Sequence, residues 1–499
     1  MDCYICEESK TKSMNQEVAG LAPEGIWKNF ELLNEVPRPS KKEEKVIQFM
    51  LDFGNSLGLE TIRDEAGNVL IKKPATPGME NRKTVVLQSH LDMVHQKNSD
   101  KVFDFDKDGI QSLIDDEWVT ADGTTLGADN GMAVAATMAV LESTDIQHPA
   151  IEALFTIDEE TGMTGAFALQ PGWLKGEILL NMDYEDEGEL CIGCAGGIDT
   201  NVKIPINRSA ADSGEVGLKF SLTGLKGGHS GVEIHLQRGN SNKILFSLIN
   251  HLGKEFGFKL SAFDGGSLRN AIPREAFAEG YLASNKLGKV KAFVDEFYAT
   301  IKGELAKTDP NVKLSIEGAE LTENPLDADS QMRLVNAVCA FPNGVYKWSN
   351  DFENLVETST NIARVKSESN EVLIQCLTRS SLESGKMDLA ESLQALFELA
   401  GGKVEHKGSY PGWNPNPKSE ILELARNKYN DLFGKLPEVK AIHAGLECGI
   451  IMSSQTQLDS VSFGPTIRNP HSPDEMVNIE TVQKFWKYLL ALLEGTPEK

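Results

Sequence analysis

An apolar run leads directly into two adjacent glutamates in the segment Ile151-Glu-Ala-Leu-Phe-Thr-Ile-Asp-Glu-Glu-Thr-Gly162. The run has the length and composition of a buried strand, and the glutamates stand at its carboxyl end. Two adjacent carboxylates can divide two tasks there. One ligates a metal ion, while its neighbour acts as general base toward a water that the metal activates. The segment therefore predicts a sheet strand that ends in a metallohydrolase site.

Strand-like and helix-like runs alternate around this segment. Further strand-like runs lie at 68–73, 84–89 and 177–182, and helical spacing of apolar residues appears at 26–33, 46–57 and 131–141. Strands that alternate with helices predict an α/β fold, with a mainly parallel central sheet covered on both faces. Ligand sites of such sheets form outside the carboxyl ends of the strands.

Metal-ligand residue types occur at several of these strand ends. His90 and Asp183 close their strand-like runs, Glu160 follows the run 151–157, and Asp129 precedes a helix. His471 lies far along the chain in Asn469-Pro-His-Ser-Pro473. Each residue alone fits a helix cap or a surface charge. Together the set predicts a two-metal site, with Asp129 as the bridging carboxylate and zinc, cobalt or manganese as suitable ions.

His90 and Asp92 stand two positions apart at the end of a predicted strand. Side chains at such a spacing face the same side, so Asp92 is expected to hold the second imidazole nitrogen of His90. The alternative is a histidine at a strand end beside a solvated aspartate. The neighbouring Glu159 is the predicted general base.

The sequence pattern changes after about residue 205. Alternating strands at 216–222, 276–281 and 372–377 are interleaved with amphipathic helices, which is typical of an α+β domain. If His471 shares a site with His90, the chain has to return to its first domain. We therefore predict a catalytic domain formed by 14–205 and 408–499, with an inserted lid and dimerisation domain at 206–407.

Charge and hydropathy exclude several classes of partner. The net charge of −25 argues against nucleic acid and anionic membranes as partners. No apolar stretch reaches the roughly 20 residues of a membrane helix, and the start lacks the features of a secretory signal. A cytoplasmic location is expected.

Two Cys-x-x-Cys pairs occur, Cys3/Cys6 and Cys191/Cys194. A zinc site from both pairs is one interpretation, but reduced apolar cysteines in a strand (Cys191 and Cys194) and in the N-terminal segment are favoured. Met14 is an alternative start to Met1.

Three further residues are candidates for substrate contact. The glycine-rich segment Gly224-Leu-Lys-Gly-Gly-His-Ser-Gly231 lacks the ending of a phosphate loop and instead predicts a tight turn that presents His229. His229 could donate to an oxyanion, and Asn270 and Arg379 could hold a substrate carboxylate. Each is otherwise an ordinary turn or surface residue.

The ordered set of motifs resembles the co-catalytic zinc metallopeptidases of the aminoacylase and carboxypeptidase-G type, and among them the Xaa-His dipeptidases. The motifs that carry the resemblance extend over nearly the whole chain: His90-Leu-Asp-Met-Val-His-Gln-Lys-Asn98, Thr125-Leu-Gly-Ala-Asp-Asn-Gly131, Asp158-Glu-Glu-Thr-Gly162, Gly227-Gly-His-Ser-Gly231, Asn270-Ala-Ile-Pro273, His443-Ala-Gly-Leu-Glu-Cys-Gly449 and Phe463 to Pro473.

The resemblance implies a role for each matching residue. It implies a zinc-exopeptidase-like fold with two Zn²⁺, one held by His90, Asp129 and Asp183 and the other by Asp129, Glu160 and His471. Asp92 would orient His90, and Glu159 would be the general base.

The resemblance also implies how the substrate is bound. His229, Asn270 and Arg379 would bind the substrate carboxylate or the oxyanion, and Glu447 the free α-amino group. A cis peptide between Asp129 and Asn130 and a homodimer are implied as well.

These expectations favour a zinc dipeptidase that cleaves dipeptides with a free N-terminus. An N-acyl-amino-acid amidohydrolase or an aminotripeptidase could use the same metal centre. A non-catalytic metal-binding protein is a further alternative, and the presence of Glu159 argues against it.

Overall fold

The computed structural model describes residues 15–350 and 352–499, and in it the chain forms two compact units. The first unit contains the described residues up to Ile192, together with Asn416–Lys440 and Ile450–Lys499. The second contains Gly193–Pro415 and Ala441–Gly449. It begins earlier than the predicted boundary at 206, because strand β9 (Gly196–Pro205) pairs with strands of the second unit. The catalytic and lid roles of these parts stay predictions.

The first unit is built on an eight-stranded sheet with the order β1-β2-β6-β3-β7-β21-β8-β20. Its strands are β1 (Glu60–Arg63), β2 (Val69–Lys73), β3 (Val85–His90), β6 (Ile151–Thr156), β7 (Ile178–Asn181), β8 (Glu189–Cys194), β20 (Glu438–Ile442) and β21 (Asp459–Ser462). The four central strands β6, β3, β7 and β21 are parallel.

The predicted α/β class is confirmed, but the sheet is mixed rather than mainly parallel. Strands β1 and β2 pair antiparallel, and so do β2 with β6 and β21 with β8. A parallel pair needs a crossover of a dozen or more residues, whereas the short turn between Arg63 and Val69 allows only an antiparallel return. The parallel centre is the part whose carboxyl ends carry the predicted metal ligands.

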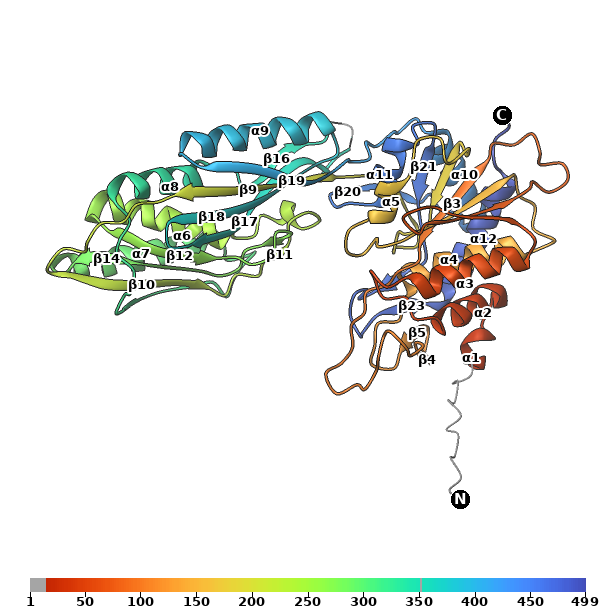
Figure 1. Cartoon of the computed structure of the whole chain (residues 1–499), viewed down its shortest axis with the longest axis horizontal. Helices are drawn as coiled ribbons and strands as arrows, with labels where there is room; N and C mark the ends of the chain where they lie inside the picture. The colour runs from red at the N-terminus through yellow and green to blue at the C-terminus, as the bar shows by residue number, and fades with distance from the viewer. Residues whose placement is uncertain (1–14, 351) are drawn as a thin grey trace, which may run out of the picture. The chain divides into compact units, whose positions relative to one another are not determined.

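Helices pack against this sheet or against one another, as Figure 1 shows for α4 and its neighbours in red and orange. They are α1 (Gln16–Ala19), α2 (Glu24–Asn34), α3 (Glu44–Ser56), α4 (Ala128–Glu142), α5 (Thr164–Ala168), α10 (Glu420–Phe433), α11 (Glu447–Ser454) and α12 (Ile479–Glu494). The Ala-rich helix α4 contacts both β3 and α2, and small side chains allow this close approach. Among the described residues, no helix combines the length and apolar character needed to cross a bilayer.

A small second sheet in this unit has the order β22-β23-β5-β4. Its strands are β4 (Ser112–Asp115), β5 (Trp118–Ala121), β22 (Ile467–Arg468) and β23 (Met476–Asn478). The hairpin of β22 and β23 carries the loop with His471, so this sheet ties a late segment of the chain to an early one.

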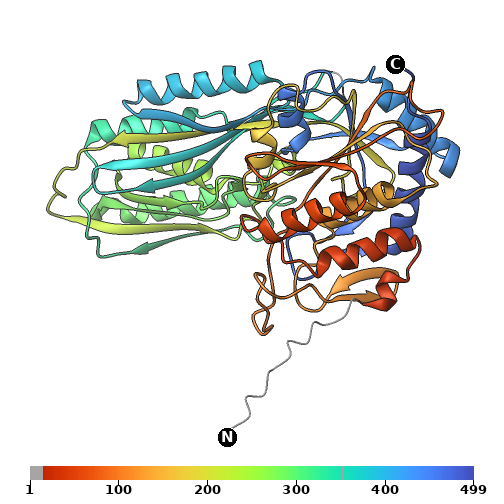
Figure 2. The ribbon, with the colours of Figure 1, turned by 45° about the vertical axis from the view of Figure 1, so that its right-hand side comes forward.

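The second unit is an antiparallel sheet with helices on one face. Its strands are β9, β10 (Glu215–Thr223), β12 (Lys259–Gly265), β14 (Ala276–Ala283), β15 (Lys313–Gly318), β16 (Gly344–Trp348), β17 (Val356–Ser367), β18 (Glu371–Ser380) and β19 (Lys403–Tyr410). Alternate strand residues form a single core cluster with α6 (Ser241–His251), α7 (Leu287–Glu304), α8 (Ala328–Ala340) and α9 (Glu383–Leu399). Figure 2 shows these strands side by side, with the light-blue helix α9 along them.

A two-stranded antiparallel sheet of β11 (Gly228–His229) and β13 (Ala271–Ile272) completes the second unit. Cys191 and Cys194 lie buried in β8, as predicted for reduced apolar residues. The expectations for Cys3, Cys6 and the two possible start residues lie outside the described residues.

Candidate functional site

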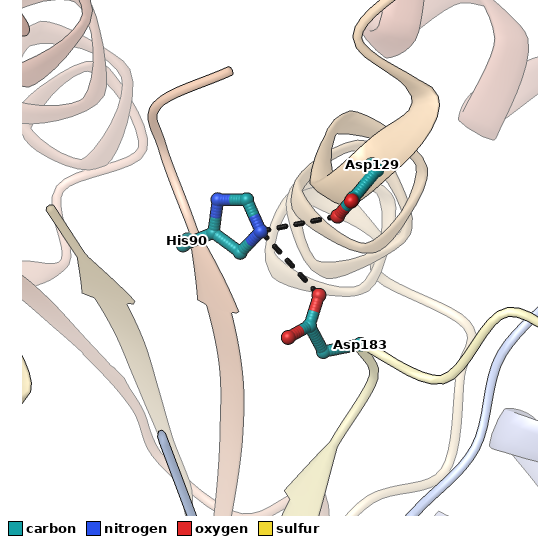
Figure 3. A group of neighbouring side chains, drawn as sticks. All are labelled: His90, Asp129 and Asp183. Carbon is teal, nitrogen blue, oxygen red and sulfur yellow. Dashed lines mark hydrogen bonds and ion pairs between the residues drawn. The ribbon is translucent and has the colours of Figure 1, made fainter. Parts of the chain in front are cut away.

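His90 lies at the carboxyl end of the central strand β3 and is buried. Its Nε2 atom is 3.1 Å from Asp129 Oδ1 and 3.4 Å from Asp183 Oδ1, as Figure 3 shows. Asp129 begins helix α4, and Asp183 follows strand β7, the parallel neighbour of β3. The sheet topology thus gathers three donors from three separate segments.

A second group of donors overlaps the first. His471 Nε2 is 2.9 Å from Glu160 Oε2 and 3.4 Å from Asp129 Oδ2. The two carboxylate oxygens of Asp129 therefore face two different imidazoles. Each group, His90 with Asp129 and Asp183 or Asp129 with Glu160 and His471, has its donor atoms within 4.8 Å of one another.

The donor set fits a divalent metal. Glu160 Oε1 is buried and has no hydrogen-bond partner among residues 15–350 and 352–499. A buried carboxylate oxygen without a partner is costly, and a cation would satisfy it. Imidazole nitrogens and carboxylate oxygens are also ligands that zinc accepts.

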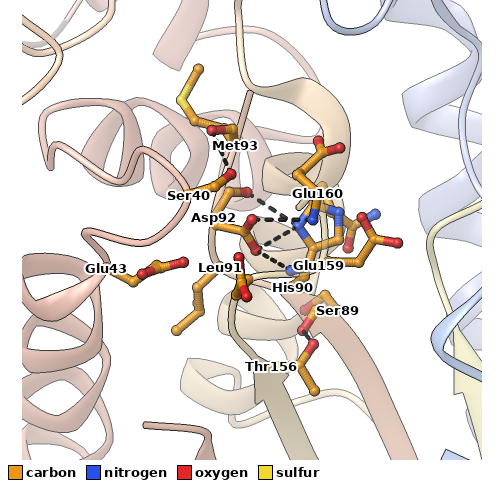
Figure 4. A network of polar contacts seen from close by, with 12 residues as sticks. Ser40, Glu43, Ser89, His90, Leu91, Asp92, Met93, Thr156, Glu159 and Glu160 are labelled. Carbon is orange, nitrogen blue, oxygen red and sulfur yellow. Dashed lines mark hydrogen bonds and ion pairs between the residues drawn. The ribbon is translucent and has the colours of Figure 1, made fainter. Parts of the chain in front are cut away.

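Asp92 organises the surroundings of His90, as Figure 4 shows. The strand ends at His90, so the contact does not arise from strand alternation as predicted. Beyond the strand end, His90 Nδ1 lies 3.1 Å from the Asp92 carbonyl oxygen and 3.4 Å from the Asp92 carboxylate. The same carboxylate accepts the backbone N–H groups of Glu159 (3.0 Å) and Glu160 (3.3 Å). Asp92 therefore orients both His90 and the turn that carries the two glutamates.

Hydrogen bonds from neighbouring side chains hold the candidate ligand Asp183 and the turn that begins at Asp158. Asn130 donates from Nδ2 to Asp183 Oδ1 (2.7 Å) and to the Met182 carbonyl (3.0 Å). Asp158, in the left-handed region at φ 55°, accepts hydrogen bonds from the hydroxyls of Thr161 and Thr164. The peptide bond between Asp129 and Asn130 is cis, as the family resemblance implied.

Negative charge accumulates at this site. Burial, together with Asp129 and Glu160, raises the pKa of Asp183 to about 6, although the nearby His90 opposes the shift. Burial next to Asp129 and Asp183 likewise raises the pKa of Glu185 to about 9. Hydrogen bonds to Asp129 and Glu160 raise the pKa of His471 to about 11. Burial is the main cause of the two carboxyl shifts, and the neighbouring carboxylates add to it; the same carboxylates raise the pKa of His471 by attracting positive charge, which divalent cations would also supply.

The predicted substrate-binding residues lie in the second unit. His229 in β11 accepts the N–H groups of Gly231 and Val232 at Nδ1, each at 3.2 Å. Its Nε2 atom lies 3.5 Å from Arg379 Nη2. Burial, and then Arg379, lower the pKa of His229 to about 4. A neutral imidazole whose Nδ1 accepts carries its proton on Nε2, so both groups direct donors to the same place.

Arg379 and the two other candidates, Asn270 and Glu447, have the following surroundings in the second unit. Arg379 is 5% exposed and donates to the Tyr410 hydroxyl at 2.7 Å. Asn270 is exposed and lies next to β13, and its backbone carbonyl accepts the Ser230 N–H. Glu447 is buried at the start of α11.

The model of peptidase family M20/M25/M40 matches residues 86–495 of the chain. The chain belongs to this peptidase family. The predicted resemblance is thereby confirmed, and members of the family are hydrolases that act on peptide bonds.

Individual relatives of this peptidase match it over nearly its whole length. The cytosol non-specific dipeptidase of Escherichia coli (strain K12) is 46% identical over 97% of this chain and 100% of its own. The crystal structure of aminoacylhistidine dipeptidase from Vibrio alginolyticus has a TM-score of 0.91 and 47% identity, and covers 97% of this chain and 99% of its own. An aminopeptidase from Bacillus cereus, at a TM-score of 0.56 and 17% identity over 95% of this chain and 98% of its own, shares the fold.

Three charged residues of this peptidase were missed by the sequence analysis. Arg38 and Glu475 are 1% and 2% exposed, and both contact the turn before Asp129. Glu185 lies two residues beyond Asp183. In the sequence Pro37-Arg-Pro39 the two prolines indicate a break between helices and give no sign that Arg38 is buried. The spacing of Glu475 behind His471, in a segment already assigned to the site, was the signal that could have found it.

A buried histidine of the second unit predicts a pH dependence of stability. Burial lowers the pKa of His443 to about 3, below its value of about 6.5 in an unfolded chain. Between these values the unfolded chain binds a proton that the folded chain does not, so stability falls as the pH falls from about 6.5. His443→Gln should flatten this fall by up to about 1.4 kcal/mol per pH unit.

Urea unfolding at pH 7 and pH 5 measures the effect. His251 is an exposed histidine of α6, and His251→Gln is the matched control. It should leave the change in unfolding free energy between pH 7 and pH 5 as in the wild type. An equal change in unfolding free energy with pH for the wild type and His443→Gln would contradict the prediction.

Proposed function

We propose that this peptidase hydrolyses dipeptides with a free N-terminus, of the Xaa-His type and with broad side-chain acceptance. One observation carries the proposal: the predicted donors form two overlapping ligand groups that share Asp129. The similarity to an Escherichia coli dipeptidase over 97% of the chain supports the substrate class. The proposed cofactor is two Zn²⁺ per chain, with Co²⁺ or Mn²⁺ as substitutes.

In this proposal Asp129 bridges the two metals. Its oxygens Oδ1 and Oδ2 face His90 and His471 at 3.1 Å and 3.4 Å, which supports one carboxylate oxygen per ion. The proposed ligands of one ion are His90, Asp129 and Asp183, and those of the other are Asp129, Glu160 and His471.

Glu159 is the proposed general base. Bound divalent metals would lower the pKa of a water and polarise the scissile carbonyl. Glu159 takes the proton from that water and passes it to the leaving amine. Its position is supported by the backbone N–H bond to Asp92, which also holds His90, so that base and ligand share one anchor.

The substrate ends are proposed to bind through residues of the second unit. Donors from His229 and Arg379 suit a carboxylate or an oxyanion, and Asn270 adds an amide. Glu447 receives the α-amino group. We further propose a homodimer and a cytoplasmic location, supported by the family resemblance and by the name of the Escherichia coli relative.

The free-amine requirement gives a direct test of this function. We expect the zinc-loaded protein to hydrolyse Ala-His and to leave N-acetyl-Ala-His intact, because a neutral amide cannot replace the charged amine at a buried carboxylate. Ala-Ala-His, which keeps the free amine, tests peptide length and should also stay intact. Separation of the products by chromatography measures each reaction, because dipeptidase cleavage gives free alanine and histidine, whereas the two alternatives release Ala-His together with acetate or alanine. Turnover of the acetylated peptide would instead support an amidohydrolase, and turnover of the longer peptide an aminotripeptidase.

A further inference from the structure

Glu475 is a buried carboxylate four positions beyond His471 in the chain, and both of its oxygens bind one turn of the backbone. Oε2 accepts the N–H groups of Leu126 (2.7 Å) and Gly127 (2.9 Å). Oε1 accepts the N–H of Asp129 (3.1 Å). The carboxylate thus holds the turn from which the shared metal ligand Asp129 projects.

This turn lacks a local cap. Helix α4 begins at Ala128, and the side chain of its N-cap residue Gly127 offers no acceptor. The N–H groups of Leu126, Gly127 and Asp129 instead bind Glu475, which follows Asp129 by 346 residues in the chain, and Asp129 itself has non-helical backbone angles (φ −83°, ψ 108°). Arg38 completes the arrangement, because its Nη2 donates to the Gly127 carbonyl at 2.7 Å. The Glu475 carboxylate therefore binds N–H groups of this turn, and the Arg38 guanidinium binds a C=O group of the same turn.

The backbone at Glu475 is held by contacts with strand β5. Thr120 donates its hydroxyl to the Glu475 carbonyl at 3.1 Å, and β23 pairs with β5 from Met476 onward. His471, in contrast, lies in a left-handed conformation at φ 63°, and its side chain is 53% exposed. Glu475 is therefore one of the points at which the segment carrying His471 is attached to the rest of the site, together with the contact of Ile467 N–H with the Glu185 carbonyl.

We propose that Glu475 is a positioning residue of the metal centre, which fixes the Asp129 carboxylate relative to His471 so that Asp129 can bridge two ions. The inference rests on the dinuclear centre of the proposed function. A bridging carboxylate has to present two oxygens at set positions, and a small rotation of the turn would move both. Residues that hold metal ligands in this way typically contribute about 10- to 100-fold to metal affinity.

The variant Glu475→Gln tests the proposal with little change in size. A glutamine has one acceptor oxygen, so its amide N–H₂ must face either Asp129 N–H or the pair of Leu126 and Gly127, and one contact becomes a clash of donors. The matched control is Glu152→Gln. Glu152 is also buried in the first unit, and its Oε2 accepts the N–H groups of Lys175 (2.8 Å) and Gly176 (2.9 Å) near the start of β6, away from the site.

Titration of metal-free protein with Co²⁺, followed by visible absorption, reports the coordination geometry directly. For Glu475→Gln we expect an altered Co²⁺ spectrum, about 10- to 100-fold weaker binding of one of two equivalents, and a lower kcat for Ala-His with little change in KM. Both variants should lose thermal stability, but Glu152→Gln should keep the wild-type spectrum and affinity. Should Glu475→Gln fail to fold, Glu475→Asp, which is one methylene shorter, takes its place.

Two results would overturn the proposal in distinguishable ways. A Glu475 variant that binds both Co²⁺ equivalents with wild-type affinity and spectrum, whatever its thermal midpoint, would reduce Glu475 to a remote helix cap. Wild-type protein that takes up a single Co²⁺ would overturn the dinuclear centre itself, and with it the bridging role.

Discussion

Removal of divalent metal by a chelator is expected to abolish dipeptide hydrolysis, and addition of Zn²⁺, Co²⁺ or Mn²⁺ to restore it. Lewis-acid stabilisation is worth several kcal/mol and each 1.4 kcal/mol is about tenfold in rate, so the loss should reach about a thousandfold or more. The rate of Ala-His hydrolysis before and after metal addition measures the effect.

A variant separates metal loss from damage by the chelator. Asp129→Ala removes the carboxylate shared by both donor groups and should lower metal content and activity together. Asp122→Ala, which removes a surface ion pair with Lys101 in the same region, is the control and should retain both. Full activity in metal-free protein, verified by elemental analysis, would contradict the proposed mechanism.

The second large effect is expected at Glu159. Glu159→Ala should lower kcat by about 10²- to 10⁴-fold while metal content stays at the wild-type level, because the residue moves a proton and is not among the proposed ligands. Steady-state kinetics combined with metal analysis of the same sample measures both quantities. The control Glu60→Gln alters an exposed glutamate paired with Lys72 on the outer strands of the same sheet.

The possible outcomes for Glu159 are clearly separated. Near wild-type kcat would rule out the general-base assignment. A parallel loss of metal and activity would place Glu159 among the ligands instead, as the close group of His90, Glu159 and Glu160 also allows.

Three of the four parallel strands of the first unit, β3, β6 and β7, could be predicted because each is a largely apolar run that ends at a polar residue, whereas β21 (Asp-Ser-Val-Ser) lacks such a run. His90, Glu160 and Asp183 each follow such a run, and the sheet rule then places their side chains together. Helix α2 (Glu24–Asn34) and helix α3 (Glu44–Ser56) likewise cover the runs at 26–33 and 46–57 whose apolar spacing predicted helices. Local patterns are sufficient where burial is continuous along one segment.

The rest depends on contacts between segments that no local pattern records. The strands β22 and β23 are only two and three residues long, so their pairing with β5 leaves no periodicity to detect. Arg38 is buried because Gly127 and Leu91 carbonyls surround it, yet in sequence it is one more charged residue between two prolines. The boundary at Gly193 escaped prediction for the same reason, since β9 is defined by its partners β18 and β19.

The scatter of the donors along the chain has a consequence for biosynthesis. A ribosome makes His90, Asp129, Glu160 and Asp183 first, then the second unit, and only afterwards the segment with His471 and Glu475. A nascent chain that stops before Pro470 has the group of His90, Asp129 and Asp183 but neither the last imidazole nor the carboxylate that secures the Asp129 turn. The group of Asp129, Glu160 and His471 can therefore form only after the second unit has been synthesised.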